Sequence, residues 1–131
     1  MSNIDEDPTP TGVLSLQTLT RPQDTNSNGD IFGGWLMGQM DLAGAIAARE
    51  ISLGPVTTVA VGSMTFLSPI RVGAIVSCYS EVIDIGRSSM RINIEVWTKH
   101  YSDPQPQKVT DAEFVFVAID AQGRTRPVRA E

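Results

Sequence analysis

One carboxylate, Asp41, interrupts an otherwise apolar stretch that has helical spacing. With about 100° of rotation per residue in an α-helix, Asp41 shares a stripe with small residues only, namely Gly34, Gly38, Ala45 and Ala48. Small side chains leave room beside a helix for another backbone, a partner subunit or a ligand. A carboxylate is costly to desolvate unless it is paired, and general bases are found in such enclosed places. The alternatives are a solvated aspartate or a structural hydrogen bond, and Asp41 alone does not decide among them.

Two glycines, Gly33 and Gly34, open the same helical stretch after the loop sequence DTNSNGDIF. Each glycine costs a helix about 1 kcal/mol relative to alanine. In return, no side chain shields the backbone N–H groups at the positive end of the helix dipole. Such donors suit a carbonyl oxygen that becomes negative during a reaction, as in an oxyanion hole. The alternative is an ordinary turn in which Asp30 or Asn28 caps the helix.

Composition and charge exclude several classes of function. The chain has 131 residues, of which 41% are hydrophobic and 19% charged, which is typical of one globular domain. Its net charge of −5 argues against a nucleic-acid partner, because phosphate backbones require a basic face. The segment 1–11 is polar and acidic and contains two prolines, so we expect a disordered tail followed by a single domain over 12–131.

The cysteine and histidine content indicates a protein without a structural metal. Cys78 is the single cysteine and His100 the single histidine, so neither an internal disulfide nor a zinc site of the Cys/His type can form. No secretory signal pattern is present at the N-terminus, and the apolar runs are far shorter than the ~20 residues of a membrane helix. We therefore expect a cytoplasmic protein that does not insert into membranes.

The hydrophobic periodicity predicts one helix and five strands. The helix, over 33–51, is apolar on nearly every side, which is typical of a helix buried on nearly every side. Short turns between successive strands favour antiparallel pairing, with a tight connection at 86–87 and a longer loop over 102–107. The simplest arrangement is an α+β fold in which a curved antiparallel sheet wraps one central helix. The predicted strands cover 13–20, 56–66, 74–85, 90–97 and 111–120.

Four segments together resemble one known family. The strings DTNSNGDIFGGWLMGQMD, SMTFLSPIRVGAIVSCY, GRSSMRINIEVW and TDAEFVFVAID are similar, in this order, to those of YciA-like acyl-CoA thioesterases of the hotdog-fold superfamily. The likeness extends from about Val13 to Arg126. The hotdog fold that it implies is an antiparallel sheet around a central helix, in agreement with the arrangement predicted from periodicity.

The resemblance implies hydrolysis of acyl-CoA thioesters to free CoA and a carboxylic acid, with no cofactor apart from the CoA of the substrate. It assigns the catalytic carboxylate to Asp41, as general base or nucleophile, and the positioning of water or thioester to Asn26. The helix-start amide that polarises the thioester carbonyl falls on Gly34. No G-x-S-x-G motif is present, which argues against a Ser-His-Asp hydrolase. His100 is expected to be solvent-exposed and not a base, and hotdog dehydratases need a histidine that the loop before the helix lacks.

The resemblance also indicates where CoA binds. It places Gly86, Arg87, Ser88 and Ser89 along the pantetheine and nucleotide, where a guanidinium is suited to a phosphate. The alternative for these four residues is a hairpin turn with solvated polar side chains. Two further residues, Thr65 and Phe66, are expected to line the groove near the thioester. Cys78 is interpreted as a buried strand residue.

Members of this family build their sites between protomers and commonly assemble as trimers of dimers, so a homohexamer is implied, with Asn26 and Asp41 reaching one site from different subunits. Several large apolar side chains fit this expectation, since they exceed what a monomer would expose: Trp35, Met37, Met40 and Met64. Two other hypotheses remain at this point. One is a non-catalytic acyl-CoA sensor that uses the same groove, and the other is a domain in which Asp41 only bonds a neighbouring subunit.

Overall fold

The computed structural model describes residues 9–129. Residues 1–8 of the expected acidic tail lie outside the described residues. The element order contains one long helix after the first strand and then four strands without a further helix, as the periodicity predicts. The elements are β1 (Val13–Leu19), the short 3-10 helix η2 (Pro22–Asp24), α1 (Gly33–Ser52), β2 (Val56–Val61), β3 (Ile75–Ile85), β4 (Ser89–His100) and β5 (Asp103–Ala118).

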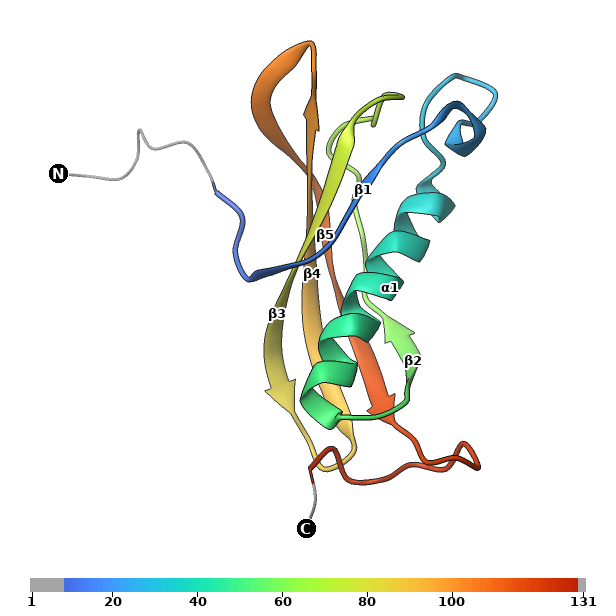
Figure 1. The fold of residues 1–131 in the computed structure, drawn as a ribbon, viewed down its shortest axis with the longest axis vertical. Helices are drawn as coiled ribbons and strands as arrows, with labels where there is room; N and C mark the ends of the chain where they lie inside the picture. The colour runs from blue at the N-terminus through green and yellow to red at the C-terminus, as the bar shows by residue number, and fades with distance from the viewer. Residues whose placement is uncertain (1–8, 130–131) are drawn as a thin grey trace, which may run out of the picture.

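The five strands form one antiparallel sheet in the order β1-β3-β4-β5-β2. The sheet curves along α1, which lies on one of its faces (Figure 1). This architecture confirms the predicted α+β hotdog fold. Within residues 9–129, no helix is long and apolar enough to cross a membrane.

Strand β4 shows which face of the sheet is apolar and packs against the helix. Its alternate residues Met90, Ile92, Ile94 and Val96 are fully buried, whereas Arg91 points to the opposite face and is exposed. The register carries this pattern across the sheet, because strand residues that are paired share a face. Burying each large apolar side chain contributes about 1.5–3 kcal/mol to folding, and this face forms most of the core.

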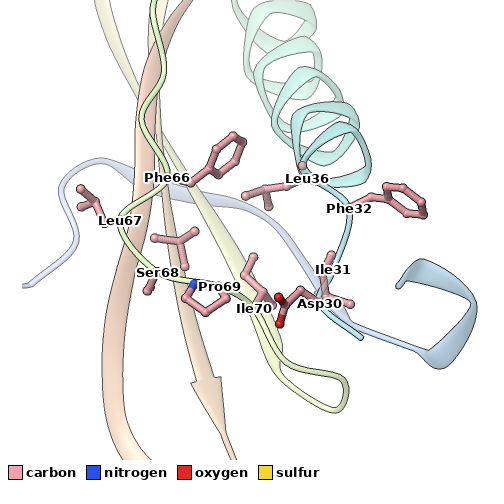
Figure 2. Close-up of a pocket in the computed structure, with 11 residues that line it drawn as sticks. Asp30, Ile31, Phe32, Leu36, Phe66, Leu67, Ser68, Pro69 and Ile70 are labelled. Carbon is pink, nitrogen blue, oxygen red and sulfur yellow. The ribbon is translucent and has the colours of Figure 1, made fainter. Parts of the chain in front are cut away.

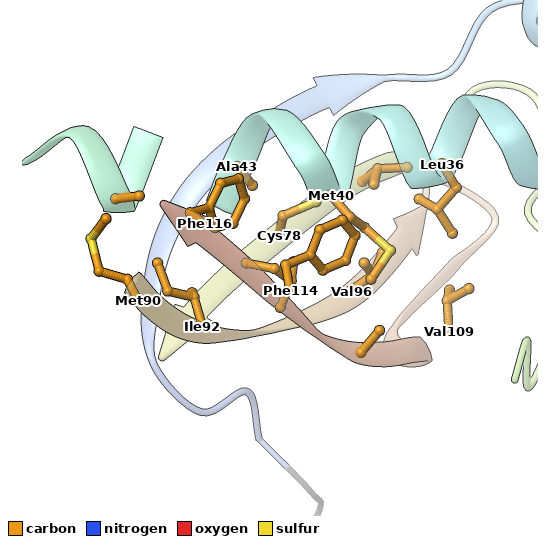
Figure 3. Close-up of a cluster of buried hydrophobic side chains, with 14 of the residues drawn as sticks. Leu36, Met40, Ala43, Cys78, Met90, Ile92, Val96, Val109, Phe114 and Phe116 are labelled. Atoms are coloured by element: carbon orange, nitrogen blue, oxygen red, sulfur yellow. The ribbon is translucent and has the colours of Figure 1, made fainter. Parts of the chain in front are cut away.

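The helix contributes a matching apolar stripe. Its buried side includes Leu36, Met40 and Ala43, which Figure 3 shows packed against strand residues of the core. Close approach depends on Gly44, because a Cβ at this position would lie 2.6 Å from the Phe116 ring. A glycine in mid-helix therefore serves packing here, in spite of its low helix propensity.

The predicted burial of the helix on nearly every side is wrong for the single chain. Met37 is 40% exposed and Leu42 52% exposed, and Gly34 and Gly38 are also exposed. The sheet covers only one side of α1, so the opposite side faces solvent. Ala48, expected on the small-residue stripe with Asp41, instead lies on the buried side of α1.

The predicted loop over 102–107 is also mostly wrong, since β5 begins at Asp103 and contains Pro104 and Pro106. Prolines are tolerated on a strand edge, where the missing N–H breaks no ladder hydrogen bond. Strand β2 pairs with β5 only at Phe114 and beyond. The early part of β5 therefore has one edge without a paired strand among residues 9–129, and this edge accommodates the prolines.

Strand β2 is shorter than predicted, because it ends at Val61, five residues earlier than the predicted strand over 56–66.

Cys78 lies on β3 and is fully buried, as predicted. Burial raises the pKa of its thiol to about 12, because an apolar environment disfavours the thiolate. We expect a chromogenic disulfide reagent at pH 8 to leave the native protein unlabelled over minutes and to detect one thiol per chain in denaturant. Rapid labelling of the folded protein would contradict this burial.

Candidate active site

The loop before α1 is held together by Asn26. Its Oδ1 accepts hydrogen bonds from the backbone N–H groups of Asn28, at 2.8 Å, and Asp30, at 3.2 Å. The Asn26 N–H donates in turn to the Asp30 carbonyl at 2.7 Å. Asparagine commonly organises turns in this way. Within residues 9–129, the Asn26 Nδ2 group makes no hydrogen bond, so this donor is available to a ligand.

The start of α1 is unblocked. Its N-cap residue is Phe32, and no side chain caps the helix, so the expected alternative of a cap by Asp30 or Asn28 is wrong. Apart from its chain neighbours and the backbone of its own helix, no heavy atom of residues 9–129 lies within 4 Å of the position that a Cβ would take on Gly34. The N–H of Gly34 belongs to the first turn, where N–H groups have no partner inside the helix. A carbonyl oxygen can therefore approach this amide at the positive end of the helix dipole.

Asp41 lies in the middle of α1 and is half-buried. The hydroxyl of Thr58 on β2 donates a hydrogen bond to its Oδ1 at 2.5 Å. Within the described chain, Oδ2 has no hydrogen-bond partner. One oxygen is thus fixed in place and the other can accept a proton or a water molecule. Sequence reasoning missed Thr58, although Val56 and Thr58 alternate toward the helix and could have indicated it.

A cavity of about 380 Å³ lies beside the start of α1. We define this helix-start pocket by residues 30–33, Leu36, 66–70 and Val109, as Figure 2 shows. The Phe66 ring lies 3.4 Å from where a Cβ of Gly33 would be, so Phe66 lies next to the unblocked amides. The Thr65 side chain is exposed, and its carbonyl accepts a hydrogen bond from Thr110. Of the two residues predicted to line the groove, Phe66 therefore lies next to Gly33 at the start of α1, whereas Thr65 does not line this pocket.

The predicted CoA-binding residues form the β3–β4 turn. The Gly86 N–H donates to the Ser89 carbonyl at 2.8 Å and closes the turn, and the Ser88 carbonyl accepts from Ala118. The Arg87 carbonyl accepts from the N–H of Val128, which ties the turn to the C-terminal segment. This turn lies beside the C-terminal end of α1 (Figure 1).

Arg126, which sequence reasoning also missed, joins the end of α1 to the C-terminal segment at the same end of the molecule. Its Nη1 donates to the Ser52 carbonyl at the end of α1, and its Nε donates to Ile119. A cation at a helix C-terminus is stabilised by the helix dipole. Three arginines thus come to this end of an acidic protein, since Arg126 and Arg129 belong to the C-terminal segment that Val128 ties to Arg87.

A single chain does not bring all the predicted residues together. Seven positions separate Gly34 from Asp41, which corresponds to about 10 Å along an α-helix. The helix has 20 residues, or about 30 Å of length, and the turn at Gly86 lies at the far end from Gly34. Within one chain, the predicted amide, carboxylate and CoA-binding turn therefore lie at three different levels along α1.

His100 is half-buried at the end of β4 rather than solvent-exposed as expected. Its Nε2 lies 3.0 Å from the Val72 carbonyl and its Nδ1 lies 2.7 Å from the Ser102 hydroxyl. Both ring nitrogens are therefore engaged in structural contacts, which agrees with the expectation that His100 is not the base. Among residues 9–129, no three His, Cys, Asp or Glu side chains are grouped so that they could hold a metal ion.

The sheet curved around one helix places the chain in the class of hotdog-fold proteins. More narrowly, the chain belongs to the thioesterase superfamily, whose sequence pattern matches residues 28–102. It is 54% identical to the acyl-CoA thioester hydrolase YciA of Salmonella typhimurium over 125 residues, which cover 93% of this chain and 94% of that protein. An uncharacterised acyl-CoA thioester hydrolase of Haemophilus influenzae is 55% identical over 123 residues, covering 92% of this chain and 80% of that protein.

Solved structures give the same family. A hexameric, broad-specificity acyl-coenzyme A thioesterase superposes with a TM-score of 0.91 at 51% identity, covering 97% of this chain and 88% of that chain. The hexameric thioesterase of Yersinia pestis superposes with a TM-score of 0.89 at 53% identity, covering 94% of this chain and all of that chain. The predicted family and fold are thereby confirmed.

Proposed function

We propose that this protein is an acyl-CoA thioester hydrolase, which releases free CoA and a carboxylic acid. Relatives with that activity in their names are more than 50% identical over nearly the whole chain. The structural observation that carries the proposal is Asp41, which is half-buried beside β2 and held at one oxygen by Thr58 of that strand. That geometry offers a carboxylate to a substrate or a second subunit.

The mechanism that we propose has three parts. The Gly34 amide donates to the thioester carbonyl oxygen and stabilises the negative charge that develops there. The free oxygen of Asp41 removes a proton from a water molecule, and this water attacks the carbonyl carbon. In the alternative, the carboxylate itself attacks the carbonyl carbon, the CoA thiolate leaves, and water then hydrolyses the mixed anhydride formed on Asp41. The leaving thiolate needs little help from an acid, and neither a metal nor a further cofactor is required.

The site that we propose is shared between two copies of the chain. About 10 Å separates the Gly34 amide from Asp41 along one helix, so the amide and the base that act on one thioester belong to different protomers. Asn26, whose Nδ2 is available, accompanies Gly34 and positions the water or the thioester. The exposed Met37 and Leu42 lie on the face that a second copy would cover. The hexameric relatives support a homo-oligomer, which we take to be a trimer of dimers.

CoA binding is assigned to the β3–β4 turn, with Gly86, Ser88 and Ser89 along the pantetheine and Arg87 on a phosphate. The concentration of arginines beside this turn supports the assignment, because the nucleotide of CoA is a polyanion and the protein as a whole is acidic. We place the enzyme in the cytoplasm, where CoA esters are formed and consumed.

The direct test is thiol release from an acyl-CoA, followed with a chromogenic thiol reagent. We expect steady turnover by the purified protein, without a background from Cys78 because this thiol is buried. Calorimetric titration with free CoA serves as the binding control. A protein that binds acyl-CoA without releasing CoA would be a sensor, and this result would overturn the proposed activity.

Replacement of Arg87 with alanine is expected to raise KM roughly tenfold and to leave kcat within about twofold. The reason is that a phosphate contact far from the reacting carbonyl stabilises the bound substrate and the transition state equally. Initial rates over a range of acyl-CoA concentrations measure both constants. The matched control is Lys99→Ala, which removes an exposed positive charge at the end of β4 that lies away from this turn. A fall in kcat without a change in KM would contradict the placement of Arg87 at the nucleotide.

A further inference from the structure

We infer that Arg126 is a positioning residue for CoA, which holds Arg87 and the β3–β4 turn in place through the C-terminal segment. We define the C-terminal segment as residues 119–129. The inference rests on the proposed function and deepens it, since it concerns how the turn assigned to CoA is held. Arg126 itself is given no contact with the substrate.

The C-terminal segment runs back from the end of β5, across the end of α1, to the β3–β4 turn (Figure 1). A tight turn first reverses the chain, because Asp120 Oδ1 accepts hydrogen bonds from the N–H groups of Gln122 and Arg124, both at 2.9 Å. The Arg126 N–H then donates to the Ala118 carbonyl at 3.0 Å. The segment is therefore fixed to the end of β5 before it reaches the β3–β4 turn.

Two backbone hydrogen bonds join this region to the β3–β4 turn. The Val128 N–H donates to the Arg87 carbonyl at 2.7 Å, and the Ala118 N–H donates to the Ser88 carbonyl at 2.8 Å. The Val128 side chain is 2% exposed and belongs to the hydrophobic core, which anchors this part of the segment. The backbone of Arg87 and Ser88 is thus held by the C-terminal segment and by the end of β5.

The guanidinium of Arg126 ties the same segment to the end of α1. Its Nη1 donates to the carbonyl of Ser52, the last residue of α1, at 3.1 Å. Its Nε donates to the Ile119 carbonyl at 2.9 Å. The last carbonyls of a helix have no partner inside the helix, and a planar cation satisfies such a carbonyl in a defined orientation. One side chain therefore links α1, the residue after β5 and the segment that carries Val128.

The position of the guanidinium depends on Gly54. A Cβ at Gly54 would lie 2.5 Å from Nη2 of Arg126, so the absence of a side chain makes room for the guanidinium. Nη2 is buried and has no hydrogen-bond partner among residues 9–129. A buried donor without a partner lowers the stability of the fold. Packing alone therefore does not account for an arginine at this place.

Loss of the Arg126 contacts should move the β3–β4 turn and not the reacting groups. Only one residue stands between Arg126 and Val128, so a shift of the segment reaches the Arg87 carbonyl directly. In contrast, eleven positions separate Asp41 from Ser52, which corresponds to about 16 Å along α1. We therefore expect Arg126 to affect KM and not kcat, as a remote contact made equally in the bound substrate and in the transition state does.

The test compares initial rates of butyryl-CoA hydrolysis by Arg126→Ala and by the control Arg124→Ala. We expect Arg126→Ala to raise KM about fivefold and to leave kcat within about twofold. Arg124→Ala removes an exposed positive charge from the same segment and should leave both constants nearly unchanged. In an Arg87→Ala background, Arg126→Ala should raise KM less than about twofold further, because the phosphate contact through which it acts is already lost.

Gly54→Ala provides a second variant, which remains informative if Arg126→Ala does not fold. It keeps the charge of Arg126 and places a methyl group against Nη2, so it displaces the guanidinium. We expect KM to rise about threefold. Attraction of CoA by the positive charge alone would instead leave KM unchanged in this variant.

The outcomes separate the inference from the proposed function. An unchanged KM in folded Arg126→Ala or Gly54→Ala would overturn the inference, and so would effects of Arg126→Ala and Arg87→Ala that multiply as those of independent sites do. In these cases acyl-CoA hydrolysis and the effect of Arg87→Ala persist. Absence of hydrolysis, or an unchanged KM in Arg87→Ala itself, would overturn the proposed function and the inference with it.

Discussion

Replacement of Asp41 with alanine is expected to lower kcat by about 10²–10⁴-fold, because the water loses its general base. The backbone donor at Gly34 and the CoA-binding turn are unaffected, so KM should change only a few-fold. Thiol release at saturating acyl-CoA measures the effect. Far-ultraviolet circular dichroism and gel filtration show whether fold and assembly are preserved.

Two further variants separate catalysis from a structural role of Asp41. Asp41→Asn keeps the shape of the side chain and can still accept from the Thr58 hydroxyl, so an inactive protein with normal assembly argues against a purely structural aspartate. Full activity of Asp41→Ala would refute the assignment of the base.

In the proposed mechanism, Thr58 acts through its hydrogen bond to Asp41 as a positioning residue. We expect Thr58→Val to lower kcat roughly tenfold, since the loss of one hydrogen bond to a charged group weakens the orientation of the carboxylate. Thr58→Ser keeps the donor and should restore most of the activity. The matched control is Thr57→Val, one position earlier on β2, where the side chain faces away from the helix. If Thr58→Val and Thr58→Ser lost kcat equally, the activity would not depend on the hydroxyl group of Thr58.

The second large effect is expected for Gly34→Pro, which removes the amide hydrogen that we assign to the thioester oxygen. Loss of one oxyanion donor lowers kcat by about 10²–10³-fold. Proline is tolerated in the first turn of a helix, where the N–H makes no helical hydrogen bond. The preceding Gly33 has no Cβ, which reduces the clash that proline imposes on the residue before it.

Gly34→Ala is the control for this variant, because it adds a methyl group and keeps the N–H. In the described part of one chain, the new Cβ has no heavy atom within 4 Å beyond its chain neighbours and the backbone of its own helix. We therefore expect Gly34→Ala to lose less than tenfold in kcat and Gly34→Pro to lose far more. Comparable activity of the two proteins would mean that the Gly34 amide does not bind the carbonyl oxygen.

The sequence predicted those features that depend on local periodicity. The alternation in β4 and the helical spacing from Gly33 onward were sufficient for the sheet, the helix and its position, since both patterns reflect burial of one face. The resemblance supplied the family and the candidate residues. It was informative because the string around Asn26, Gly34 and Asp41 is long and specific.

Features that depend on register and on distant segments could not be predicted. The hydrogen bond from Thr58 to Asp41 requires knowledge of how β2 lies against the helix. The strand over Asp103–Ala118 contains prolines that local rules assign to a loop, and only the unpaired edge explains them. The helix-start pocket is built from three segments that are separated in the chain, so no local pattern indicates it.

The central claim is that one reaction site takes its base from one copy of the chain and its helix-start amide from another. Under this claim, Gly34 and Asp41 can be assigned to one carbonyl although they lie about 10 Å apart along one helix. It also explains why α1 leaves Met37 and Leu42 exposed on the side of the small residues.

The most direct test is subunit complementation. Chains carrying Asp41→Ala and chains carrying Gly34→Pro, each inactive alone, are co-expressed with different tags, and the hybrid oligomers are purified. With two equivalent sites at each twofold interface, a hybrid pair contains one site with both natural residues, so random mixing should restore roughly a quarter of the natural activity. Hybrids that are no more active than the two parents would contradict the claim.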